Sequence, residues 1–182
     1  MTIKRTLLLI TLLIIAAVLT CGYMLNTEKK NFELKIISLG DSSKSPACLQ
    51  MFNLIERKSE ANGIPKYILY NVAWLETRYR GPFDWSYNPY QTSSAGAQGP
   101  MQIITRYAHE HAGYHVSPKE LRTNLELNIN ISCSMLKNLY KRYGRWDIVL
   151  GYYNTGYPQV NDYATYGVSN KDYKVKWIRP NF

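Results

Sequence analysis

The first 25 residues contain a long apolar run that is unsuited to the surface of a water-soluble protein. A short basic segment, Met1–Arg5, precedes a stretch from Leu7 to Leu19 that only Thr11 interrupts. With its flanks the stretch covers 20 residues, Thr6–Leu25, which is close to the roughly 20 that a helix needs to cross a bilayer. A basic run followed by an apolar run at an N-terminus is typical of an export signal. The sequence therefore predicts that the rest of the chain folds outside the cytoplasm.

Three fates of this segment fit the sequence. Thr20 and Gly22 are small enough to flank a cleavage site after Gly22, and Val18–Cys21 is a poor version of a lipoprotein box. A clean Ala-x-Ala cleavage site is absent, which favours an uncleaved anchor with its basic end in the cytoplasm. We therefore expect residues 1–25 to be a signal anchor or signal peptide. The expected location is the periplasm or the outer face of the cytoplasmic membrane, with residues 6–25 as the anchor.

The remaining residues divide into a connecting segment and one domain. Residues 26–44 mix charges with serines, so we expect a stalk or linker. Residues 45–182 suffice for one compact domain. The chain has 22 Lys+Arg and 13 Asp+Glu, a net charge of +9, which favours polyanions such as anionic lipid or acidic wall polymers. Signatures of nucleic-acid-binding folds are absent, so we expect no nucleic acid partner.

Helical signals dominate the domain. Proline residues mark helix starts, glycines mark helix ends, and Ser117–Glu120 is a capping box that contains proline. The clearest periodicity covers residues 125–143 and stops at Gly144. No hairpin signal competes, and the tyrosine-rich residues 83–99 predict a long functional loop. The sequence predicts a mainly α domain with helices over 45–62, 65–80, from 101, from 117, 125–143 and 147–154.

Glu76 lies on the apolar face of the second of these helices. Val72 and Leu69 precede it by four and seven residues, so helix geometry directs its carboxylate toward the apolar side. Burial there disfavours the charged form and raises the pKa, as a general acid near neutral pH requires. The alternative is that Glu76 pairs with Arg78 or Arg80 at a helix end.

Four segments in order resemble motifs of the SLT-type lytic transglycosylases, a goose-lysozyme-like family. Leu75–Tyr79 resembles their Glu-Ser-x-Phe motif, with Thr and Tyr for Ser and Phe. Ser94–Ile103 resembles their Gly-Ala-x-Gly-Leu-Met-Gln-Ile stretch, with Pro100 for Leu. Tyr152–Gly156 is similar to their Ala-Tyr-Asn-Ala-Gly motif, and Asp172–Val175 to their late Asn-Tyr-Val segment.

The resemblance covers roughly residues 45–178 and implies a lysozyme-like helical domain with a glycan-binding groove. It implies cleavage of the β-1,4 bond between N-acetylmuramic acid and N-acetylglucosamine in peptidoglycan without water, which leaves 1,6-anhydro ends. Glu76 would be the sole general acid and base, whereas most glycosidases need two carboxylates. We expect no cofactor and no metal, because His109, His111 and His115 are poorly spaced for one helical face.

The same resemblance implies roles for the other motif residues. Gln102 and Asn154 would bind sugar or N-acetyl groups, Met101 and Tyr153 would line the groove, and Tyr173 would orient Glu76. The expected substrate-binding residues are Thr77, Ser94, Met101, Gln102, Tyr153, Asn154 and Tyr173. Ordinary core packing is the alternative for Tyr153 and Met101.

Two rival functions remain at this point. A hydrolytic goose-type lysozyme on the same fold would need a second acid, for which Asp84 is the only candidate close in sequence. A catalytically silent wall-binding component is the alternative from another class, and an intact Glu76 argues against it. The small size resembles members associated with an envelope-spanning secretion or conjugation machine, a further candidate partner.

Two cysteines of the domain predict a disulfide. Export places the thiols in an oxidising compartment, where paired cysteines tend to be joined. Cys48 falls in the first turn of its helix, and Cys133 falls on the apolar stripe of residues 125–143. We expect a Cys48–Cys133 bridge; the alternative is that each is a small buried hydrophobe.

Overall fold

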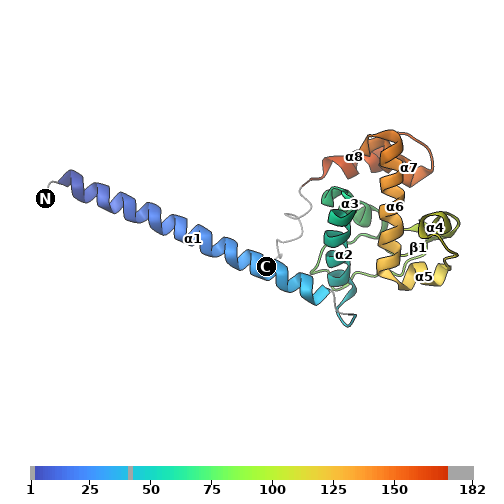
Figure 1. The fold of residues 1–182 in the computed structure, drawn as a ribbon, viewed down its shortest axis with the longest axis horizontal. Coiled ribbons are helices and arrows are strands. Elements are labelled where there is room, and N and C mark those ends of the chain that lie inside the picture. Colours follow the sequence, from blue (N-terminus) through green and yellow to red (C-terminus); the bar gives the residue numbers. More distant parts are fainter. Residues whose placement is uncertain (1–2, 41–42, 172–182) are drawn as a thin grey trace. The chain divides into compact units, whose positions relative to one another are not determined.

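The computed structural model describes residues 3–40 and 43–171, and Figure 1 shows the course of the chain. It divides into an N-terminal unit that ends at Ser38 and a larger unit that begins at Leu39. The N-terminal unit is formed by one helix, α1 (Ile3–Gly40). The residues expected to form a linker therefore continue this helix as far as Gly40, and their Glu and Lys residues are good helix formers.

Part of α1 has the length and composition of a membrane span. Among the described residues, Ile10–Glu28 is the candidate, with 19 residues and a hydropathy of 1.9. A cleavable signal sequence meets the same criteria, so this finding agrees with the expected apolar segment and leaves its three fates open.

The larger unit is mainly helical, as the sequence predicts. Its described part contains α2 (Ala47–Asn62), α3 (Lys66–Thr77), β1 (Ala97–Gln98), β2 (Ile103–Ile104), α4 (Thr105–Ala112), α5 (Pro118–Thr123), α6 (Leu125–Tyr143), α7 (Trp146–Thr155) and α8 (Asp162–Ser169).

Helix α6 is the central element of this unit (Figure 1). It packs against α2, α4, α5 and α7, while α3 packs against α2 and α8. Ile129 and Leu136 of its apolar stripe are fully buried. The side chain of Asn124 caps its first turn, and Gly144 ends it in the left-handed conformation with φ 67°.

Local capping signals set several helix ends where the sequence predicts them. Gly63 ends α2 in the left-handed conformation. Ser117 and Glu120 form both hydrogen bonds of a capping box at the start of α5. These boundaries are confirmed because the caps satisfy backbone groups without help from distant residues.

The end of α3 differs from the prediction, which carried the helix to residue 80. Arg78 takes the left-handed conformation with φ 60°, and the helix stops at Thr77. The next residue, Tyr79, is fully buried, and its hydroxyl donates to the Cys48 carbonyl oxygen at 2.9 Å. Burial of the Tyr79 ring therefore ends α3 at Thr77, before the helix reaches Gly81, where the sequence predicted its end.

A small hairpin replaces the helix that was predicted to start at Met101. Strands β1 and β2 pair antiparallel, and α4 begins only at Thr105. Asn128 of α6 holds the turn between the strands: its Oδ1 accepts from Met101 N, and its Nδ2 donates to the carbonyl oxygens of Gln98 and Leu121, each at about 3 Å. The prediction of a helix is wrong because this buried amide competes for the backbone groups that a helix would use.

The predicted disulfide is also wrong, since Cys48 and Cys133 are both buried free thiols. Cys48 lies near Tyr79, at the start of α2. Cys133 lies near Lys58, whose charge acts on its thiol. Lys58 is ten residues after Cys48, about 15 Å along a helix, and a bridge requires Cα atoms within about 7 Å. Both residues face the core, but at different levels of α2.

Gly99 is the residue of the hairpin turn that tolerates substitution least. An added Cβ would lie 2.2 Å from the Leu121 carbonyl oxygen and 2.5 Å from Asn128 Nδ2, and its φ is +74°. We expect Gly99→Ala to destabilise the protein by about 3 kcal/mol or more, because strain and overpacking add. Thermal unfolding of the detergent-solubilised full chain measures this.

Gly96→Ala is the matched control. Gly96 has a similar φ of +79°, and an added Cβ would meet nothing within 4 Å. We expect this variant to lose about 1 kcal/mol, the cost of the left-handed conformation alone. Equal losses for the two variants would contradict the role of close packing at Gly99.

Candidate active site

Glu76 is the penultimate residue of α3, and its side chain is half-buried. Burial raises the pKa of its carboxyl group from 4.5 to about 7, while a hydrogen bond from Tyr163 acts in the opposite direction. The Tyr163 hydroxyl donates to Glu76 Oε1 at 2.7 Å. Near neutral pH, this carboxyl group can therefore both donate and accept a proton.

Glu76 does not pair with the arginines that follow it. The guanidinium groups of Arg78 and Arg80 lie 5.2 Å and 5.8 Å from the centroid of the Trp74 ring. Trp74 precedes Glu76 by two residues, so the two side chains leave the helix about 200° apart. The alternative in which Glu76 is a helix-end ion pair is thus wrong, and neither Arg78 nor Arg80 is among the causes of the pKa shift of Glu76.

Tyr163 was not among the residues expected at the site. The resemblance assigned its role to Tyr173, which lies outside the described residues. Tyr163 is in the first turn of α8, a helix that the sequence analysis missed. The signal was available: Asn161 caps the helix and Asp162 is an acid in its first turn.

The start of α8 is fixed by contacts with α7. The Asn161 side chain accepts from Ala164 N and donates to Asn154 Oδ1 at 3.1 Å. Further along α8, a Cβ on Gly167 would lie 2.4 Å from Leu150 Cδ1. The two helices approach closely because Gly167 has no side chain, and this approach sets the height of Tyr163 over α3.

The end of α8 is attached to α3 by Asn71. Its Nδ2 donates to the carbonyl oxygens of Gly167 and Asn170 at 2.9 and 2.8 Å, and its Oδ1 accepts from Asn170 Nδ2 at 3.0 Å. Asn71 is buried, so these bonds satisfy an amide that water does not reach. Helix α3 therefore holds α8 at two points, through Asn71 at one end and Glu76 at the other.

Thr77 and Met101 face the protein interior. The buried Thr77 hydroxyl donates to the Pro100 carbonyl oxygen at 2.9 Å and lies 3.2 Å from the Tyr87 hydroxyl. The Met101 side chain is fully buried. The substrate contacts expected from these two residues are replaced by structural ones: Thr77 joins α3 to the hairpin, and Met101 packs in the core.

Tyr153 lies close to Glu76. Burial, and next the charge of Glu76, raise the pKa of the Tyr153 hydroxyl well above its ordinary value. This hydroxyl donates to the Met101 carbonyl oxygen at 2.7 Å and lies 3.1 Å from Ser132 Oγ. Tyr153 thus connects α6, α7 and the hairpin beside the acid.

The three other expected residues lie nearer the surface. Gln102 is half-buried with φ 49°, and its Nε2 donates to the carbonyl oxygens of Gly99 and Gln91. Asn154 is exposed and contacts α8 as described above. Ser94 is exposed in the turn before β1, and no contact recorded for the described residues joins it to Glu76.

Asp84 is not placed as a second catalytic acid. Its carboxylate accepts a hydrogen bond from Ser86 Oγ at 2.5 Å, and its backbone closes turns with Gly81 and Tyr87. Its charge acts on Tyr79 and Tyr87, whereas it is not among the causes of the raised pKa of Glu76.

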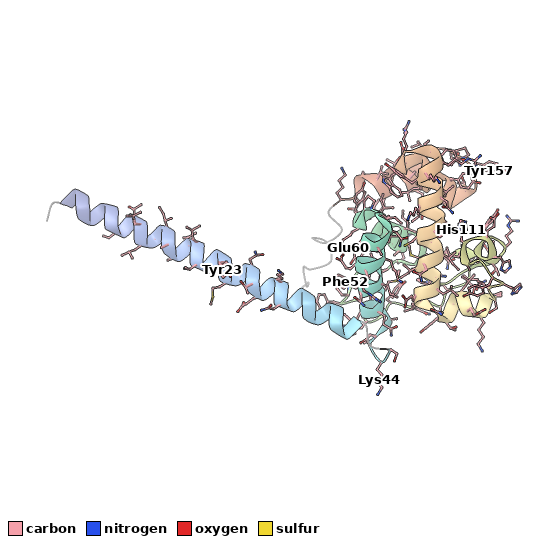
Figure 2. The ribbon with its side chains drawn as sticks, in the orientation of Figure 1. Tyr23, Lys44, Phe52, Glu60, His111 and Tyr157 are labelled. Atoms are coloured by element: carbon pink, nitrogen blue, oxygen red, sulfur yellow. The ribbon has the colours of Figure 1, made fainter. Side chains whose placement is uncertain are left out.

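The histidines of α4 and the following loop make ordinary contacts. His109 Nδ1 accepts from Val116 N at 3.0 Å, and its ring stacks on His115. His111, labelled in Figure 2, has its Nδ1 3.1 Å from Ser134 Oγ of α6. A search of the described residues finds no cluster that could hold a metal ion.

The comparison with protein families matches most of the larger unit. The model described as the transglycosylase SLT domain matches residues 53–176, which is 124 of the 182 residues. The matched region includes Glu76, Asn128, Tyr153 and Tyr163. A search of curated proteins finds no significant match.

Loss of the Tyr163 hydroxyl should raise the pKa of Glu76 further. The hydrogen bond favours the ionised carboxylate and lowers the pKa, so Tyr163→Phe should shift the titration of Glu76 upward from about 7. Carbon NMR of the labelled side-chain carboxyl group over a pH series measures this. Tyr157→Phe is the control, because Tyr157 lies at the surface beyond the end of α7 (Figure 2). An unchanged or lower pKa in Tyr163→Phe would exclude this hydrogen bond.

Proposed function

The chain belongs to the transglycosylase SLT family, whose domains act on peptidoglycan as lytic transglycosylases do, and we propose that Glu76 carries out its reaction alone. The proposed reaction cleaves the β-1,4 bond between N-acetylmuramic acid and N-acetylglucosamine. The muramic acid 6-hydroxyl takes the place of water, and the product has a 1,6-anhydro ring. The observation that supports this best is the half-buried carboxyl group of Glu76, which accepts a hydrogen bond from Tyr163 and whose pKa is raised by burial to about 7.

The first step uses Glu76 as an acid. Its protonated carboxyl group gives the proton to the oxygen of the glycosidic bond, and the bond from that oxygen to the muramic acid C1 breaks. The N-acetylglucosamine 4-hydroxyl leaves with the proton. The N-acetyl carbonyl oxygen of the muramic acid bonds to C1 and carries the positive charge, so no second protein carboxylate is needed.

The second step uses Glu76 as a base. Its carboxylate removes the proton from the 6-hydroxyl, and the oxygen attacks C1 while the bond to the N-acetyl oxygen breaks. Glu76 ends protonated, ready for another cycle. A pKa near 7 suits both steps. A much lower pKa would leave little of the carboxyl group protonated, and a much higher pKa would make it too weak an acid to protonate the glycosidic oxygen. Tyr163 holds the carboxylate in position between the steps.

Two features favour this reaction over its rivals. A hydrolytic lysozyme with Asp84 as second acid would need that carboxylate near Glu76, but Asp84 is bound to Ser86 in its own turn. A silent wall-binding protein would have no need of a half-buried carboxyl group whose burial costs free energy.

The products test the reaction directly. Purified full-length protein in detergent should release muropeptides with 1,6-anhydro-muramic acid ends from isolated sacculi, as mass spectrometry would show. Glu76→Gln should keep the fold and lose activity by a factor on the order of 10² or more, because the amide cannot transfer the proton. Reducing ends alone would identify a hydrolase, and wild-type rates in Glu76→Gln would assign the acid elsewhere.

We further propose that α1 retains the protein at the cytoplasmic membrane with the domain in the periplasm. The proposal is supported by the apolar segment Ile10–Glu28, by the basic residues that precede it, and by a domain that acts on peptidoglycan. An uncleaved anchor predicts a mature protein of full-length mass that stays with membranes after a high-salt wash. A mature N-terminus at Tyr23, or a lipid on Cys21, would contradict it.

A further inference from the structure

The two arginines after Glu76 converge on one aromatic ring. Arg78 is in the left-handed conformation, which is uncommon for a residue with a side chain. Burial of Tyr79 directs the residues on either side of it to the surface, where both Arg78 and Arg80 are exposed. Their guanidinium groups lie within 6 Å of the centroid of the Trp74 ring, at 5.2 and 5.8 Å.

No ion pair found among the described residues joins Arg78 or Arg80 to a carboxylate. The ion pairs seen there include those of Lys58, Lys66 and Arg145. Two like charges held against one ring repel each other, and an anion bound between them would remove that repulsion. Guanidinium groups bind carboxylates through two parallel hydrogen bonds, so a carboxylate is the anion that suits them best.

The position of the pair relates this anion to the substrate. In peptidoglycan, the muramic acid ring that carries the scissile bond at C1 also carries the peptide stem, through the lactyl ether at O3. The two sugars are uncharged where the stem is attached, whereas the stem bears free carboxylates. Arg78 and Arg80 follow Glu76 by two and four residues, and their guanidinium groups lie over Trp74 on another side of α3. A muramic acid placed at Glu76 would therefore reach them with the carboxylates of its extended stem, past the end of α3, and not with the sugar itself.

We propose that Arg78 and Arg80, supported by Trp74, bind a carboxylate of the peptide stem attached to the muramic acid that is cleaved. The inference rests on the proposed function, because it requires muramic acid at Glu76. It adds a substrate preference: strands with stems bind better than strands from which the stems have been removed. Because the guanidinium groups lie on the side of α3 away from the carboxyl group, they bind the stem without lowering the pKa of the acid.

The test compares strands that carry stems with strands that lack them. An amidase removes each stem by hydrolysing its bond to the lactyl group, which leaves a lactyl carboxylate beside the muramic acid ring. The stripped strands therefore stay anionic at the ring but lack the carboxylates of the stem. Uncrosslinked glycan strands with stems, and the same strands stripped by an amidase, are digested by the full-length protein in detergent. Wild type should show a KM at least about tenfold lower for strands with stems, since each charge-assisted hydrogen bond is worth that much or more. Arg78→Gln with Arg80→Gln should abolish this difference and leave kcat and the KM for stripped strands unchanged.

Three further variants complete the design. Arg106→Gln is the matched control, because Arg106 is also exposed and also stacks on a ring, that of Tyr107 at 4.7 Å; it should behave as wild type. Arg80→Gln alone, which leaves the left-handed turn intact, should lose part of the preference. Replacement of both arginines by lysine should restore part of it, because lysine keeps the charge without the paired hydrogen bonds.

The outcomes separate this inference from the proposed function. Equal losses on both substrates would show that the arginines only stabilise the end of α3, and an unchanged preference would show that they do not contact the stem. Either result would overturn the inference while anhydro products still formed. Absence of anhydro products from both substrates with wild type would overturn the proposed function and this inference with it.

Discussion

The hydrogen bond between the half-buried Glu76 carboxyl group and the Tyr163 hydroxyl forms only if α8 is held against α3. The hydroxyl that binds Glu76 belongs to Tyr163, 87 residues further along the chain. Three contacts bring it there: Asn161 with Asn154 at the start of α8, Gly167 against Leu150 in its middle, and Asn71 at its end. Because α3 carries both Glu76 and Asn71, a shift of α8 would disturb both contacts together. The position of the acid and that of its partner are therefore set by the same pair of helices.

A second buried amide does the same for the hairpin. Asn128 uses its oxygen and both amide hydrogens on three backbone groups, and the turn that it holds offers the Pro100 carbonyl oxygen to Thr77. Removal of a buried amide would leave several backbone groups without partners, which costs more than one hydrogen bond contributes. In this fold, buried asparagines hold the hairpin turn and the end of α8, where apolar packing alone would not specify the positions of the backbone groups.

The sequence predicts what is decided locally and fails where a distant residue decides. The ends of α2, α5 and α6 follow from Gly63, the Ser117 capping box and Gly144, which act within one turn. The burial of Glu76 follows from helical spacing. The end of α3 depends on the burial of Tyr79, and the hairpin depends on Asn128. The separation of the two thiols depends on the different levels along α2 at which they lie. None of these has a local signal in the sequence. Helix α8 is different: its N-cap is visible at Asn161, and the sequence did not identify Tyr163, while the expected role of Tyr173 falls outside the described residues.

The positions of Arg78 and Arg80 explain how the pKa of Glu76 stays raised in a chain with a net charge of +9. A guanidinium group in contact with Glu76 would favour its ionised form and lower its pKa, and little acid would remain at neutral pH. Here Trp74 holds Arg78 and Arg80 on another side of the helix, so the pKa of Glu76 reflects a balance between burial and one neutral hydroxyl. A neutral partner lowers the pKa less than a cation would, which leaves it near 7. The indole therefore has an electrostatic consequence for Glu76: it holds both guanidinium groups on another side of α3, and neither of them lowers the pKa of the carboxyl group.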